Sequence, residues 1–116
     1  MVMPQFKTLV DEAKKEIQEI DANQLKKMQN SGEDFSLVDV RDKEDADKGM
    51  IPGAVNVSRG MLEYKIDQVT TDPNRKIVLY CGGRSRSALA AASLKKMGFE
   101  NVISLKGGYK GWKEST

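Results

Sequence analysis

Apolar residues along this chain recur in two patterns, short continuous runs and regularly spaced stripes. The runs are rich in β-branched residues, as the buried strands of a parallel sheet are. They lie at residues 35–40, 54–57, 76–80 and 102–105. A short edge strand is expected at residues 17–20, where two isoleucines flank two polar residues. The stripes between them repeat every three or four residues, the spacing of an amphipathic helix. The alternation predicts an α/β domain with a central, mostly parallel five-stranded sheet flanked by helices on both faces.

The ends of several stripes carry residues that begin helices. Pro4 suits a first helical turn, and the apolar positions after it predict a helix to about Lys15. Asp21 followed by Gln24 has the form of a capping box, so a second helix is expected there. Ser58 is expected to cap another helix. The remaining helices are expected at residues 42–48, 58–66, 87–97 and around 112.

Length and composition describe one ordinary globular domain, at 116 residues with 39% hydrophobic and 31% charged content. The net charge of +2 is too small to indicate a nucleic-acid partner. No apolar segment reaches the length of a membrane span, and the first residues lack the apolar core of a signal peptide. We therefore expect a cytoplasmic protein with no membrane and no nucleic-acid partner.

The chain contains one cysteine and no histidine. One cysteine excludes an internal disulfide and a dithiol redox site. Without histidine, the common zinc sites and the Cys-His and Ser-His catalytic pairs are excluded as well. We expect no metal and no cofactor, so any sulfur chemistry must use one thiol and an external partner.

The single cysteine lies where the strand over 76–80 ends. Cys81 is followed by two glycines and then by a helix. Ligands of open α/β sheets bind at such strand ends, where the N–H groups of a glycine-rich turn and a helix N-terminus face an anion. These surroundings, with Arg84 and Arg86, lower the pKa of a thiol from its ordinary value near ~8.5. An inert buried cysteine is the simpler interpretation, but the position favours a nucleophilic thiolate in an anion-binding loop.

Four motifs lie in order along the chain at residues 37–41, 49–57, 80–88 and 105–112. Together they resemble the motifs of the single-domain rhodanese family, the thiosulfate sulfurtransferases. The resemblance runs from about residue 17 to residue 114. It implies the rhodanese-like three-layer fold, with a rhodanese-like domain over 16–116 and an N-terminal helical extension over 1–15.

The resemblance also implies a role for each residue of the loop. Cys81 would accept the sulfur atom as a persulfide, and the backbone amides of the loop would surround it. The loop residues are Gly82, Gly83, Arg84, Ser85 and Arg86. Arg86 would close the loop on the anion, whereas Arg84 adds a charge that favours a more anionic substrate. Asp39 and Arg41 would support the loop from the neighbouring strand, and Ser87 would support it from the helix. For Asp39 a salt bridge or cap alone is the alternative.

The implied reaction is a double displacement. Cys81 would take sulfane sulfur from thiosulfate or a related small anionic donor, and cyanide or a thiol would then accept it. A protein could serve as donor or acceptor in place of either small molecule. A loop that already holds a thiolate needs no general base, which agrees with a chain that has no histidine.

Two alternatives stay open. A cysteine phosphatase or arsenate reductase also uses a cysteine in an anion loop that ends in arginine. In the related dual-specificity phosphatases, however, five residues lie between the cysteine and the arginine. In this chain, four residues lie between Cys81 and Arg86. The second alternative is a persulfide carrier with little turnover of free thiosulfate. The N-terminal helix could dock its partner, although packing on the domain is the simpler interpretation.

Overall fold

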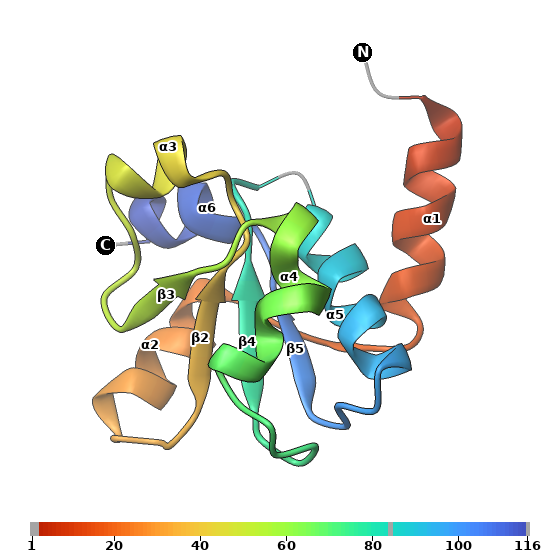
Figure 1. The fold of residues 1–116 in the computed structure, drawn as a ribbon. Coiled ribbons are helices and arrows are strands. Elements are labelled where there is room, and N and C mark those ends of the chain that lie inside the picture. The colour runs from red at the N-terminus through yellow and green to blue at the C-terminus, as the bar shows by residue number, and fades with distance from the viewer. Residues whose placement is uncertain (1–2, 84, 116) are drawn as a thin grey trace.

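The computed structural model describes residues 3–83 and 85–115 (Figure 1). The strands are β1 (Gln18–Ile20), β2 (Ser36–Asp39), β3 (Ala54–Asn56), β4 (Ile77–Tyr80) and β5 (Val102–Leu105). They form one sheet in the order β1-β5-β4-β2-β3, and each neighbouring pair is parallel. The predicted α/β architecture is confirmed, and each predicted strand agrees with the structure to within one residue at either end.

The helices follow the predicted order along the chain. They are α1 (Pro4–Lys14), α2 (Ala22–Asn30), α3 (Lys43–Asp47), α4 (Leu62–Lys65), α5 (Arg86–Lys96) and α6 (Gly108–Glu114). Two single turns of 3-10 helix, η1 (Arg59–Met61) and η2 (Ile66–Gln68), flank α4. The prediction of one continuous helix over 58–66 is therefore wrong, because a short α-helix lies there between two 3-10 turns.

The capping predictions have different outcomes. Asp21 and Gln24 form the predicted box, because each side chain accepts the other residue's backbone N–H at 2.8 Å. Ser58 does not cap a helix, since its side chain accepts no such bond. Its backbone carbonyl accepts a hydrogen bond from the Met61 amide, which closes a 3-10 turn. Gly60 lies within this turn and disfavours a longer α-helix.

Helices cover both faces of the sheet (Figure 1). The α5 face is packed by α4 and α5, with Leu62 and Leu94 in its core, and the α6 face is packed by α2 and α6, with Leu25 in its core. Successive residues of a strand point to opposite faces. Tyr80 therefore belongs to the core of the α6 face, and Cys81 belongs to the core of the α5 face.

Helix α1 packs on α5 instead of on the sheet. Val10 and Ala13 contact Ala88 and Ala92 in a small separate core. Figure 1 shows α1 beside α5 at the edge of the domain. This contact agrees with the interpretation that the N-terminal helix packs on the domain.

Candidate active site

Cys81 lies one residue beyond β4, which is flanked by β2 and β5 in the sheet. The Tyr80 carbonyl just before it accepts the Val40 amide at 2.9 Å, so the end of β4 is tied to β2. The cysteine is only 1% exposed. The strand end that the sequence singled out is thus an interior position beneath the loop that follows it.

Two buried hydroxyls lie next to the thiol. Cys81 Sγ donates to Ser87 Oγ at 3.8 Å, and Ser87 Oγ is 2.8 Å from Ser104 Oγ. Each of the three residues is 1% exposed. Ser87 is not the first residue of its helix, because α5 begins at Arg86, and its side chain turns inward to the cysteine. Sequence reasoning missed Ser104, although a serine within the apolar run of β5 was a signal for it.

The N-terminus of α6 holds the other side of the loop. The Tyr109 amide donates to the Cys81 carbonyl at 2.8 Å, and the Lys110 amide donates to the Gly82 carbonyl at 3.3 Å. The C=O and N–H of a trans peptide point in opposite directions. The amides of Gly82 and Gly83 therefore point away from α6.

Two glycines make this contact between loop and helix feasible. Gly108 has φ +57°, and a Cβ there would lie 2.7 Å from the Gly83 nitrogen and would also collide with the Cys81 carbonyl oxygen. Gly83 has φ +142°, a backbone conformation that residues with a side chain rarely adopt. Ser85 takes the left-handed conformation as well, at φ 68°. The tight approach of α6 to the loop accordingly depends on the absence of side chains.

A cavity of about 20 Å³ adjoins Cys81. Its walls include the three serines Ser85, Ser87 and Ser104 and the three charged residues Lys14, Glu19 and Lys106. A cavity needs roughly 10–15 Å³ to hold one water molecule. The space beside the thiol therefore accommodates one atom or group of about that size.

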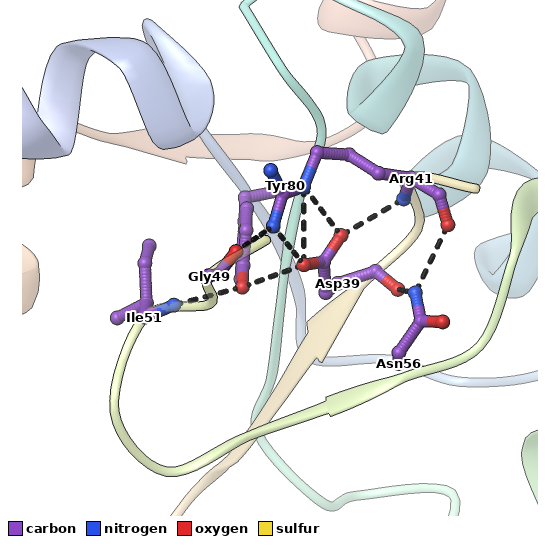
Figure 2. Close-up of polar contacts among 6 residues, drawn as sticks. All are labelled: Asp39, Arg41, Gly49, Ile51, Asn56 and Tyr80. Carbon is purple, nitrogen blue, oxygen red and sulfur yellow. Dashed lines mark hydrogen bonds and ion pairs between the residues drawn. The ribbon is translucent and has the colours of Figure 1, made fainter. Parts of the chain in front are cut away.

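On the α6 face, Asp39 and Arg41 form a buried ion pair (Figure 2). The Arg41 guanidinium donates to Asp39 Oδ2 at 2.6 Å from Nη2 and to Oδ1 at 3.0 Å from Nε. It also donates to the Gly49 carbonyl at 2.6 Å. The hydrogen bond with Asp39 raises the pKa of Arg41, so the guanidinium stays charged.

Tyr80 connects this ion pair to β4. Its hydroxyl donates to Asp39 Oδ2 at 2.9 Å and accepts the Ile51 amide at 3.1 Å (Figure 2). Burial raises the pKa of the Tyr80 phenol above its ordinary value; the Ile51 amide opposes this shift and Asp39 reinforces it. Asn56 Nδ2 completes the cluster by donating to the carbonyls of Asp39 and Arg41, each at 2.9 Å.

The ion pair reaches the loop through aromatic residues. The Arg41 guanidinium lies 4.2 Å from the centre of the Tyr109 ring, and the Tyr109 amide holds the Cys81 carbonyl. The structure thus brings Asp39 and Arg41 to the base of the loop, on the face opposite the thiol. Sequence reasoning missed Tyr80 and Tyr109 as members of this support. The supporting role expected for Asp39 and Arg41 stays a prediction.

The two loop arginines are placed differently. Arg84 lies outside the described residues. Arg86 is the first residue of α5 and is exposed, and within 3–83 and 85–115 its side chain has no ion pair. The prediction that Arg86 closes the loop on an anion is not tested by this arrangement.

Two kinds of feature are absent from residues 3–83 and 85–115, a metal-binding cluster and a membrane-spanning helix. Within this part of the chain, no three histidine, cysteine, aspartate or glutamate residues are grouped so that they could hold a metal ion. Nor does this part contain a helix with the length and hydropathy needed to cross a membrane.

Comparison with known proteins places the chain in a family. The sequence pattern of the rhodanese-like domain matches residues 21–115, so the chain belongs to this family. The match omits α1 and β1, although β1 pairs with β5 in the sheet. The boundary between an extension over 1–15 and a domain over 16–116 therefore stays a prediction.

Two curated relatives are about one-third identical to this chain over the aligned residues. "Thiosulfate sulfurtransferase GlpE" of Shewanella oneidensis is 34% identical, over 83% of this chain and 92% of the relative. "Putative sulfur carrier protein YrkF" of Bacillus subtilis is 33% identical, over 86% of this chain and 53% of the relative. This chain thus spans about half the length of YrkF but nearly all of GlpE.

A solved structure from Rhodopseudomonas palustris matches almost the whole chain. It is described as "Protein of Unknown Function" and "Possible Tyrosine Phosphatase". It is 33% identical with a TM-score of 0.86, over 99% of this chain and 93% of its own. The coverage includes α1, which the family match leaves out.

Proposed function

We propose that this chain is a sulfurtransferase that carries sulfane sulfur as a persulfide on Cys81, with thiosulfate or a related small anion as the donor. Family membership and the names of the relatives support sulfur transfer in general. The observation that carries the finer proposal is the cavity of about 20 Å³ beside Cys81. It suits the one sulfur atom that a persulfide adds to Sγ, whereas a phosphoryl group attached to the same sulfur needs a larger space.

In the first half-reaction, Cys81 loses its proton to solvent and the thiolate attacks the outer sulfur of thiosulfate. A bond forms between Sγ and that sulfur, and the bond between the two sulfurs of thiosulfate breaks. The electron pair leaves with sulfite. The persulfide then extends from Sγ into the cavity bordered by Ser85, Ser87 and Ser104.

The second half-reaction returns the cysteine to its starting state. A cyanide ion or a thiolate attacks the outer sulfur of the persulfide and takes it. The sulfur–sulfur bond breaks, and its electron pair returns to Sγ as a thiolate. Neither half-reaction needs an oxidant, a reductant or a cofactor.

The surroundings of Cys81 favour negative charge on the transferred sulfur. The amides of Gly82 and Gly83 point away from α6, and helix α5 begins five residues beyond the cysteine. N–H groups and a helix N-terminus stabilise an anion that lies against them. The Ser87 hydroxyl, already 3.8 Å from Sγ, supplies a further polar group. These groups take the place of a general base.

A persulfide carrier is the main alternative, and the name of the relative YrkF favours it. Such a carrier would use the same Cys81 persulfide but would receive and deliver sulfur through a partner protein. The two functions therefore differ in turnover with small molecules rather than in the site.

A cysteine phosphatase is the second alternative, suggested by the description of the Rhodopseudomonas palustris structure. Four residues between Cys81 and Arg86, together with the small cavity, argue against it. Hydrolysis of an aryl phosphate tests it directly.

The decisive experiment is incubation with thiosulfate followed by intact-protein mass measurement. We expect one added sulfur atom, its loss on addition of cyanide, and repeated formation of thiocyanate. Cys81→Ser should gain no sulfur, and Ser93→Ala, at a helix position away from the cavity, should behave as the unaltered protein.

The outcomes separate the three functions. A protein that gains no sulfur from thiosulfate contradicts the proposal. One that gains sulfur but forms negligible thiocyanate is a carrier. Release of phosphate from an aryl phosphate that is lost in Cys81→Ser identifies a phosphatase.

A further inference from the structure

The cavity beside Cys81 includes residues from a part of the chain that the family match leaves out. Lys14 is the last residue of α1 and Glu19 is the middle residue of β1, and both contribute to the walls of this cavity. The match to the rhodanese-like domain begins at residue 21. The N-terminal segment therefore contributes to the candidate site and is more than a packed extension.

The position of Lys14 follows from the way α1 docks. Val10 and Ala13 are 5% and 6% exposed and pack on Ala88 and Ala92 of α5. Ala88 also adjoins the cavity and follows Ser87 directly. The contact that anchors α1 thus lies against the site itself and holds the end of the helix beside the thiol.

Glu19 is placed by the register of the sheet. Glu19 lies opposite Ser104 in the β1–β5 pair, and Ser104 lies opposite Leu79 in the β5–β4 pair. Residues in register on parallel strands point to the same face. Glu19 and Ser104 therefore lie on the α5 face, next to the position from which Cys81 projects.

Lys14 and Glu19 form a long ion pair. Their charged atoms are 3.9 Å apart, and their side chains are 34% and 24% exposed. An ammonium group carries three donors, and a contact of this length satisfies little of that capacity. Lys106 adds a second positive charge to the same walls. The cavity thus has two lysines and one glutamate among its walls.

We propose that Lys14 binds the anionic sulfur donor at the Cys81 site and that Glu19 moderates its charge. This inference rests on the proposed function, and it names one residue of this chain that selects the sulfur donor. The ammonium would attract the sulfonate-like end of the donor, whose outer sulfur must reach Sγ. An acceptor thiol whose only charge is that of its thiolate has no sulfonate-like group for Lys14 to bind, so Lys14 favours the first half-reaction.

The test compares Lys14→Gln with Lys15→Gln. The two substitutions remove the same charge from neighbouring positions, and Lys15 is exposed at the end of α1 and does not adjoin the cavity. In Lys14→Gln, kcat/KM for thiosulfate should fall about fivefold, the effect of one partly exposed charge pair. In the same variant, kcat/KM for an acceptor thiol without a sulfonate-like group should stay unchanged. Both kcat/KM values should stay unchanged in Lys15→Gln.

Glu19→Gln should raise kcat/KM for thiosulfate, since it removes the negative charge that moderates Lys14. Raising the ionic strength should narrow the difference between Lys14→Gln and the unaltered protein, because salt screens exposed charges. Equal kcat/KM values in Lys14→Gln and Lys15→Gln would overturn the inference.

A second readout separates this inference from the proposed function. Cys81 is alkylated with iodoacetate, an anion, and with iodoacetamide, its neutral analogue. For each variant, the rate with iodoacetate is divided by the rate with iodoacetamide, and this ratio is compared with that of the unaltered protein. The ratio should fall in Lys14→Gln and stay constant in Lys15→Gln, whether or not thiosulfate is a substrate. A constant ratio in both contradicts the role of Lys14, whereas absence of persulfide in the unaltered protein contradicts only the proposed function.

Discussion

The end of β4 separates two buried polar clusters that differ in the distances of their contacts and in the space around them. On the α6 face, the Asp39 carboxylate accepts five hydrogen bonds, from Arg41 and Tyr80 (Figure 2). On the α5 face, the neighbouring residue Cys81 faces the Ser87 hydroxyl at 3.8 Å and a cavity of about 20 Å³. The first cluster is held by short hydrogen bonds, and the second has a cavity beside the cysteine sulfur.

This difference suggests a division of roles between two adjacent residues. A closely bonded buried network makes its part of the structure rigid, and here it includes β2, β4 and the turn before β3. The thiol, in the role proposed for it, needs space for the transferred sulfur and a loop of fixed shape. We propose that the first cluster serves stability and that the second serves the proposed sulfur transfer, and the predictions below test that separation.

The largest effect is expected from Asp39→Ala. It leaves Arg41, which is 5% exposed, as a buried charge without its carboxylate, a change that costs roughly 3–5 kcal/mol of unfolding free energy. Urea unfolding followed by Trp112 fluorescence measures it. Asp11→Ala, which breaks the exposed ion pair with Lys7, is the control and should have no measurable effect. Similar results for both variants would contradict a stabilising role for the Asp39 cluster.

Gly108→Ala tests the contact between α6 and the loop. The new Cβ would collide with the backbone at Cys81 and Gly83, at a position with φ +57°. We expect a loss of roughly 2–3 kcal/mol and slower persulfide formation, because α6 must move off the loop. Gly111→Ala is the matched control: its nearest neighbour is the Lys106 oxygen at 3.8 Å. Alanine at that helical position should stabilise by about 0.5–1 kcal/mol.

Tyr80→Phe removes one hydroxyl from the supporting cluster. Asp39 loses a donor and the Ile51 amide loses its acceptor, for a cost of about 1–2 kcal/mol. The rate of persulfide formation on Cys81 should change by less than about twofold. Tyr64→Phe, at a side chain that is 78% exposed, controls for the substitution itself. A large loss of rate with unchanged stability would place Tyr80 in the reactive cluster instead.

Ser104→Ala should slow persulfide formation and leave stability nearly unchanged, the reverse of the result expected for Tyr80→Phe. It removes the hydroxyl 2.8 Å from Ser87 Oγ, so Ser87 loses the group that orients it toward Cys81. We expect stability to change by less than about 1 kcal/mol and persulfide formation to slow about fivefold. Unfolding curves and stopped assays with mass detection measure the two quantities. A variant that loses stability but keeps its rate would show that the two clusters share one role.

Local features of the site could be predicted from the sequence alone. The apolar runs and stripes located the strands and helices, and the two glycines after Cys81 indicated a tight turn at a strand end. The capping box of Asp21 and Gln24 was also predicted, because its two residues lie three positions apart and form both hydrogen bonds within one turn. The prediction for Ser58 was wrong because the helix it was expected to cap does not continue through its first turn.

Tertiary structure decided which residues share the site. Tyr80 and Asp39 are 41 positions apart, and Ser87 and Ser104 are 17 apart. Lys14 reaches the cavity only because α1 docks on α5. Spacing along the chain determines which face of an element a side chain occupies, so the sequence by itself determined the order of elements and the position of the cysteine. Sheet register and helix packing determine which faces meet, and these arise from contacts between distant segments that no local pattern encodes.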